Sequence, residues 1–87
     1  MIWRVFFTPI AERELKRLSK PGIQRIKDEL KALAEEAYPR HHVKKLKSHQ
    51  NNPMYSYRVG RYRIILTIEN GVMVIFVIEI GDRYTVY

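Results

Sequence analysis

The hydrophobic pattern of the chain changes from helical to β periodicity near residue 54, and this change constrains the fold most strongly. Before it, apolar residues recur at helical spacing in residues 9–18 and 23–37, with charged residues on the opposite faces. After it, β-branched and aromatic residues dominate to the end of the chain, as they also do in residues 2–7. The predicted order is β-α-α-β-β-β, with a short extra strand around residues 43–47. We therefore expect an α+β fold with an N-terminal strand, a two-helix hairpin and a three- to four-stranded, mainly antiparallel sheet.

Local signals predict where the two helices begin and end. Thr8 is a good N-cap, and Pro9 follows it at the first helical position, where a missing N–H costs nothing. Residues 19–22, Ser-Lys-Pro-Gly, are expected to break the first helix. The second helix is expected from about Ile23 to Ala37, because the residue before Pro39 is pushed out of the helical region.

The length of 87 residues predicts a single domain over residues 1–87. The chain contains no cysteine, which excludes thiolate catalysis and Cys-ligated zinc and fits a reducing compartment. No apolar run approaches the roughly 20 residues of a membrane span, and the N-terminus lacks the basic head of a signal peptide. These features predict a cytoplasmic protein without a membrane partner.

The excess positive charge lies in one central segment. The formal net charge is +7, from 16 Lys and Arg against nine Asp and Glu. No acidic residue occurs between Glu36 and Glu69, whereas seven basic residues do: Arg40, Lys44, Lys45, Lys47, Arg58, Arg61 and Arg63. Such a concentration is typical of surfaces that bind a phosphate backbone or an acidic protein. A basic surface that only keeps the protein soluble is the alternative.

Two tight turns would place two of these arginines side by side. Gly60 is expected to adopt a positive φ in a turn with Arg61, and Asn70-Gly71 is a strong hairpin signal. If both turns have two residues, Val59 faces Tyr62, Arg58 faces Arg63, Glu69 faces Val72, and Arg63 faces Ile78.

Alternation along the strands then gives the sheet two different faces. The nearly apolar face, expected under the helices, carries Tyr57, Val59, Ile64, Leu66, Ile68, Met73, Ile75 and Val77. The open face carries Ser56, Arg58, Arg63, Ile65, Phe76 and Ile78. Opposed like charges are unfavourable unless an anion lies between them, so the pattern predicts an anion site at Arg58 and Arg63. Alternatively, one arginine turns to solvent or pairs with Glu79 or Asp82.

Arginine and tyrosine are the reactive groups expected near this site. The candidates are Tyr55, Tyr57, Tyr62, Tyr84, Tyr87 and Arg83. Arginine stabilises a pentavalent phosphate, and tyrosine stacks on bases or transfers protons, which suggests RNA binding with or without cleavage. His41, His42 and His49 lie in a polar loop where adjacent histidines rarely share a metal, so no metal site is expected. A histidine acid–base pair, as in pancreatic ribonuclease, is a further alternative.

Three segments resemble the RelE/ParE toxin superfamily. Residues 55–65, YSYRVGRYRII, are similar to its central motif of Tyr, a basic residue, an apolar residue, Arg or Lys, Val, Gly, a variable residue, Tyr, Arg and apolar residues. Residues 77–87 resemble the closing strand with its Arg and C-terminal Val-Tyr, and residues 45–47 resemble an upstream basic-Leu element. With the predicted element order, the resemblance covers essentially the whole chain and implies a RelE-like fold.

The resemblance also implies a chemistry, in which the 2′-OH of an mRNA in the ribosomal A site attacks the adjacent phosphate. Arg63 would stabilise the phosphorane, Arg58 would help activate the 2′-OH, Arg83 would act as clamp or proton donor, and Tyr87 would stack on or orient the nucleotide. The implied catalytic residues are Arg58, Arg63, Arg83 and Tyr87, and the implied RNA-binding residues are Lys44, Lys45, Lys47, Ser56 and Arg61. Two residues depart from the pattern. Ser56 replaces a basic residue, and Asp82 stands where His or Lys often precedes the arginine.

The resemblance favours a metal-independent mRNA endoribonuclease that inhibits translation as the toxin of a type II toxin–antitoxin pair, without a cofactor. Its expected partners are ribosome-bound mRNA and an acidic RelB-type antitoxin, in an assembly that could be a heterotetramer. A ParE-like inhibitor of DNA gyrase shares the fold and needs no nuclease residues. A non-catalytic module that binds RNA or the antitoxin is the third interpretation.

Overall fold

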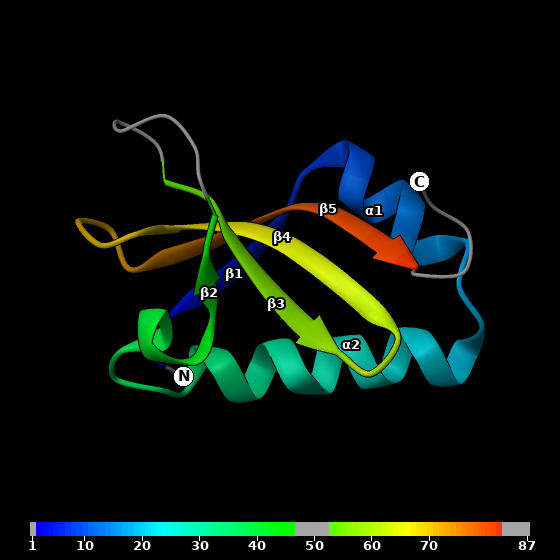
Figure 1. The fold of residues 1–87 in the computed structure, drawn as a ribbon, viewed down its shortest axis with the longest axis horizontal. Coiled ribbons are helices and arrows are strands. Elements are labelled where there is room, and N and C mark those ends of the chain that lie inside the picture. Colours follow the sequence, from blue (N-terminus) through cyan, green and yellow to red (C-terminus); the bar gives the residue numbers. More distant parts are fainter. Residues whose placement is uncertain (1, 47–52, 83–87) are drawn as a thin grey trace.

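A five-stranded sheet forms the body of the protein. The computed structural model describes residues 2–46 and 53–82. The strands are β1 (Arg4–Phe7), β2 (Lys44–Lys45), β3 (Tyr55–Val59), β4 (Tyr62–Glu69) and β5 (Val74–Asp82), in the spatial order β1-β5-β4-β3-β2. β1 pairs with β5 in parallel, and the other pairs are antiparallel. The expected α+β fold is confirmed, with the N-terminal strand as an edge of the sheet (Figure 1).

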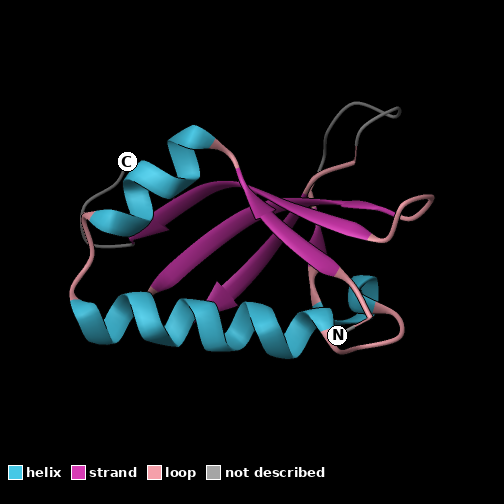
Figure 2. Cartoon of the chain, turned by 180° about the vertical axis from the view of Figure 1, so that it is seen from behind, coloured by secondary structure: helices cyan, strands magenta, loops and turns pink. Residues whose placement is uncertain are grey.

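Two helices connect β1 to the rest of the sheet, α1 (Pro9–Lys16) and α2 (Lys20–Ala34) (Figure 2). Thr8 caps α1 as predicted, since its side chain accepts a hydrogen bond from the Ala11 N–H. The boundaries predicted for the second helix are wrong. Ser19 caps it, so Pro21 and Gly22 lie inside its first turn, and Glu35 is already its C-cap. Proline is tolerated there because the first N–H groups of a helix have no intrahelical partner.

The hydrophobic core lies between the helices and one face of the sheet. The residues buried there include Ala11, Leu15, Ile26, Leu30 and Leu33 of the helices and Val59, Ile64, Leu66, Ile68, Ile75 and Val77 of the strands. In the part of the chain that the structure describes, both α-helices lie on this one side of the sheet, and the opposite side is called the open face below. Neither helix in the described part of the chain has the length and apolarity needed to span a membrane.

The β3–β4 turn has the geometry predicted from its glycine. Val59 pairs with Tyr62, so Gly60 and Arg61 form a two-residue turn. Gly60 has φ +58° whereas Arg61 does not have a positive φ, which is the pattern of a type II′ turn. A Cβ on Gly60 would lie 2.9 Å from Nη1 of Arg25, but this is the end of an exposed side chain that can move aside, so the positive φ is what favours glycine here.

The β4–β5 turn is longer than predicted. Glu69 pairs with Val74 rather than with Val72, and the turn comprises residues 70–73. The Met73 N–H donates to the Asn70 carbonyl, and Met73 adopts the left-handed conformation with φ 54°. Met73 therefore lies exposed in the turn and not on the apolar face. Four-residue loops of this kind are commonly built around a type I turn.

A β-bulge corrects the predicted pairing further along β5. Ile65 pairs with Glu79 but Leu66 pairs with Val77, so Ile78 is the extra residue. The first helix fixes this bulge. The Thr8 hydroxyl donates to the Ile78 carbonyl over 3.0 Å, and a Glu14 carboxylate oxygen accepts from the Ile80 N–H over 2.8 Å. The longer turn shifts the partner of Arg63 by two residues and the bulge by one more, so Arg63 faces Gly81 and not Ile78.

Candidate functional site

Arg58 and Arg63 face each other on the open face of the sheet. They are directly paired across β3 and β4, which confirms the predicted register, and both side chains are exposed. Opposed residues have Cβ atoms about 4.5–5.5 Å apart, so the guanidinium groups can reach one small anion together. Among the described residues, neither arginine forms an ion pair with a carboxylate. The fold thus presents two like charges that an anion would neutralise.

Two further predicted RNA-binding residues share this face. Ser56 pairs with Ile65 on one side and with Lys44 on the other, one row away from the arginines. Lys45 pairs with Tyr55 and therefore points to the opposite side of the sheet. Glu79, opposite Ile65, adds a negative charge to the open face.

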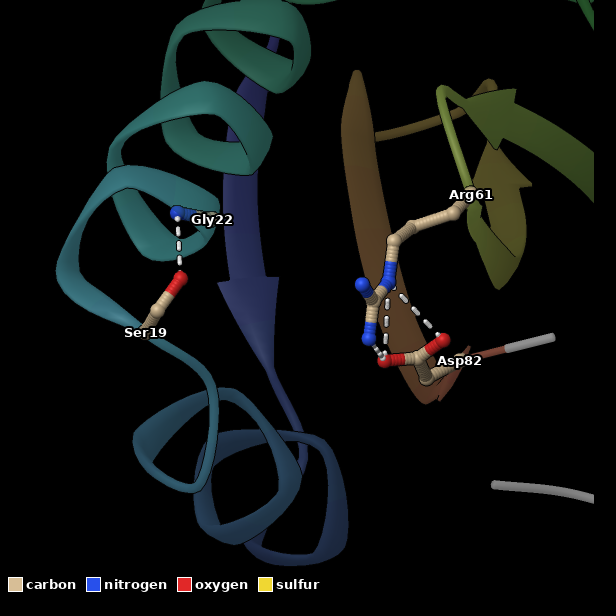
Figure 3. Close-up of polar contacts among 4 residues, drawn as sticks. All are labelled: Ser19, Gly22, Arg61 and Asp82. Carbon is tan, nitrogen blue, oxygen red and sulfur yellow. Dashed lines mark hydrogen bonds and ion pairs between the residues drawn. The ribbon is translucent and has the colours of Figure 1, made fainter. Parts of the chain in front are cut away.

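Arg61 is held at the turn by Asp82. Its Nε donates to both carboxylate oxygens at 3.1 Å, and its Nη2 lies 2.5 Å from Oδ2 (Figure 3). The Asp82 side chain is 9% exposed and the Arg61 side chain is 50% exposed. This bidentate pair ties the β3–β4 turn to the end of β5 and neutralises part of the charge that the sequence assigned to RNA binding.

Three predicted tyrosines, Tyr55, Tyr57 and Tyr62, point to the helix side of the sheet and not to the open face, so for them the expected place beside Arg58 and Arg63 is wrong. Tyr55 and Tyr62 are buried in the core. The Tyr57 hydroxyl donates to a side-chain oxygen of Glu29 on α2 at 3.3 Å. Partial burial, followed by the negative charge of Glu29, raises the pKa of Tyr57 above its usual value. The tyrosines point to the helices because side chains alternate along a strand, so the neighbours of an arginine on the open face lie on the opposite face.

The histidines are involved in local contacts. His42 approaches Glu36 at 3.2 Å, and the His41 ring stacks on Tyr38 with centroids 5.4 Å apart. Within residues 2–46 and 53–82, no group of three His, Cys, Asp or Glu side chains could hold a metal ion. Lys47, His49, Arg83, Tyr84 and Tyr87 lie outside the described residues, so their predicted roles stay predictions.

Sequence reasoning missed the contribution of β1 to the open face. Arg4 and Phe6 are exposed there, and Phe6 pairs with Phe76 of β5. Their alternation with the half-buried Val5 and Phe7 could be predicted from the sequence, but the sequence did not indicate that β1 pairs with β5. The open face therefore has basic residues on β1 as well as on β2, β3 and β4.

A sequence model matches residues 5–87, and it describes the ParE toxin of the type II toxin–antitoxin system parDE. The chain belongs to this toxin family. The match begins at the second residue of β1 and runs to the end of the chain, so it includes Arg58, Arg63 and the other site residues predicted from the sequence. No curated protein matches the toxin significantly.

Solved structures of RelE toxins have the same fold as this toxin. The archaeal RelE–RelB complex from Pyrococcus horikoshii matches with a TM-score of 0.79 and 26% identity, over 99% of this chain and 100% of that one. The isolated Escherichia coli RelE toxin matches with a TM-score of 0.70 and 21% identity, over 92% of this chain and 83% of that one. The RelBE2 complex of Mycobacterium tuberculosis matches with a TM-score of 0.68 and 23% identity, over 95% and 93%. The expected RelE-like fold is therefore confirmed.

Proposed function

We propose that the toxin is a metal-independent endoribonuclease that cleaves mRNA in the ribosomal A site and so inhibits translation. The observation that carries this proposal is the exposed pair of Arg58 and Arg63, opposed on the open face without a described carboxylate partner. Two guanidinium groups that converge on one phosphate match the charge that develops when a 2′-OH attacks it.

In the proposed reaction, the substrate supplies its own nucleophile. The 2′-oxygen of the RNA forms a bond to the adjacent phosphorus, and the bond from phosphorus to the 5′-oxygen of the next nucleotide breaks. Arg63 stabilises the pentavalent phosphorane, and Arg58 stabilises the oxyanion that forms when the 2′-OH gives its proton to water. Lys44 and Ser56, one row away, would hold the flanking backbone. Two further roles come from the sequence resemblance. Arg83 would act as proton donor or electrostatic clamp, and Tyr87 would orient the nucleotide.

Inhibition of DNA gyrase is the second candidate function. The matching family model is named for the ParE toxin, which favours this candidate. The position of the tyrosines favours it too, since Tyr55, Tyr57 and Tyr62 point away from the arginines and leave proton transfer to other residues. On this alternative, Arg58 and Arg63 would bind DNA or an acidic surface of gyrase and catalyse nothing.

The proposed partner is an acidic RelB-type antitoxin. The archaeal and mycobacterial relatives were solved as toxin–antitoxin complexes, and this toxin carries a net charge of +7. Electrostatic attraction would mainly raise the association rate, so binding should slow as salt increases. We propose a heterotetramer of two toxins and two antitoxins as the assembly.

The two candidate functions are separated by offering the purified toxin both targets. One reaction contains ribosomes programmed with a defined mRNA, and the other contains DNA gyrase with supercoiled DNA. We expect mRNA cleavage in the first and no trapped DNA breaks in the second. Arg63→Ala should remove the cleavage, while Arg13→Ala, which removes an exposed arginine from α1, should not. Gyrase-dependent DNA breakage without mRNA cleavage would replace the first proposal with the second.

A further inference from the structure

Two phenylalanines form an exposed aromatic pair on the open face. Phe6 and Phe76 are partners in the parallel pairing of β1 with β5, and their ring centroids are 5.9 Å apart at an interplanar angle of 31°. They are 44% and 40% exposed. The Arg4 guanidinium carbon lies 5.4 Å from the Phe6 centroid.

The core does not account for this exposure. The neighbours of Phe76 in β5, Ile75 and Val77, are fully buried under the helices, so the inner face is filled without the phenylalanines. Contact between two cross-strand aromatic rings is a modest stabilising interaction, and it leaves much of both rings accessible. An exposed aromatic surface beside a cation is typical of proteins that bind single-stranded nucleic acid.

The aromatic pair lies on the same face as the arginine pair, at a distance that suits one strand of RNA. Phe76 is opposite Thr67, which is four residues along β4 from Arg63. At about 3.3 Å per residue and about 4.8 Å between strands, the two sites are about 14 Å apart. This separation is about four nucleotides at the 3.4 Å rise of stacked bases, and fewer for an extended strand.

The charges around the pair favour a polyanion as its occupant. Arg4 flanks the phenylalanines, and Arg58 and Arg63 lie at the other end of the face.

We propose that Phe6 and Phe76 form a base-stacking subsite for the mRNA, a few nucleotides from the phosphate held by Arg58 and Arg63. Arg4 binds the phosphate of the stacked nucleotide or stacks on its base. This inference rests on the proposed ribonuclease function and adds a second point of contact, which fixes the direction of the strand across the sheet. Stacking tolerates every base, so the subsite supplies affinity and register rather than sequence preference.

The test uses ribosomes programmed with an mRNA that carries 2′-O-methyl groups in the A-site codon and therefore cannot be cleaved. One nucleotide at a time, in and beside that codon, is replaced by 2-aminopurine, whose fluorescence is quenched by stacking. Toxin binding is measured in parallel by co-sedimentation. Phe6→Leu and Phe76→Leu remove the aromatic rings but keep apolar side chains, and Tyr38→Leu removes an exposed aromatic ring outside the sheet as the control.

We expect wild-type toxin to quench 2-aminopurine at one position within four nucleotides of the cleavage site. Phe76→Leu should abolish that quench and weaken binding about fivefold or more, with a similar effect for Phe6→Leu and none for Tyr38→Leu. Binding without such a quench, or with a quench that both variants retain, would overturn the subsite alone. A wild-type toxin that does not bind programmed ribosomes would overturn both proposals.

Discussion

Gly22→Ala tests whether the first turn of α2 is packed against the sheet as closely as the structure indicates. Gly22 is buried, and a Cβ built on it would lie 2.5 Å from the Tyr62 hydroxyl oxygen and 3.2 Å from the ring carbon that bears it. Tyr62 belongs to the core and cannot move away freely. The methyl group therefore forces either the tyrosine or the start of the helix to shift.

The expected net effect is a loss of stability. Overpacking of this kind costs about 1–3 kcal/mol. Replacing glycine by alanine stabilises a helix by up to about 1 kcal/mol, with the smaller values expected in a first turn. We therefore expect the free energy of unfolding to fall by about 1 kcal/mol, which corresponds to a decrease in Tm of about 4–8 °C for a domain of this size.

Urea unfolding followed by circular dichroism measures this difference. In a Tyr62→Phe background the nearest hydroxyl oxygen is gone, so Gly22→Ala should cost clearly less there than in the wild type. Gly71→Ala is the matched control, because a Cβ at Gly71 meets nothing within 4 Å and its φ is not positive. If Gly22→Ala is as harmless as Gly71→Ala, or costs the same in both backgrounds, the close contact with Tyr62 is refuted.

Two further predictions concern the arginines and the tyrosine of the inner face. Arg61→Ala should lower the free energy of unfolding by about 1–2 kcal/mol in thermal or urea unfolding, since it removes charge-assisted bonds to the nearly buried Asp82. Arg58→Ala should leave the free energy of unfolding unchanged, or raise it by relieving the repulsion from Arg63. Equal losses in the two variants would contradict a stabilising role for the Arg61–Asp82 pair. The raised pKa of Tyr57 means that its contribution to stability is complete below its usual pKa and is lost as the pH rises through the raised value. Tyr57→Phe should therefore reduce the alkaline loss of stability, and identical pH profiles above pH ~10 would count against the contact with Glu29.

The parts of the fold set by local chemistry were predictable from the sequence. Thr8 and Pro9 specify the start of α1, and Gly60 specifies a two-residue turn that pairs Arg58 with Arg63. Alternation from that turn then separates the apolar face from the open face. Phe76 also lies on the open face as predicted, because the longer β4–β5 turn shifts the register by two residues and so preserves the faces.

The parts that depend on distant contacts were not predictable in the same way. The bulge at Ile78 is fixed by Thr8 and Glu14, which are far away in the sequence, and it changes the partner of Arg63. The start of α2 could have been found, since Ser19 is a good N-cap and Pro21 is tolerated in a first turn. The parallel pairing of β1 with β5 depends on tertiary packing and was not predictable from the sequence. The contact between Phe6 and Phe76 follows from that pairing, so it was not predictable either.

The central claim is that Arg58 and Arg63 hold one reacting phosphate. A double-mutant cycle at these two residues tests it, with single-turnover cleavage of mRNA on programmed ribosomes as the measurement. Each single alanine variant should cleave at least about 100-fold more slowly, as expected when a transition-state donor is lost. The double variant should be much less impaired than the product of the two effects, because residues that act as a unit are not additive. Unchanged cleavage by a folded Arg63→Ala protein, or two fully multiplicative effects, would contradict a shared anion site.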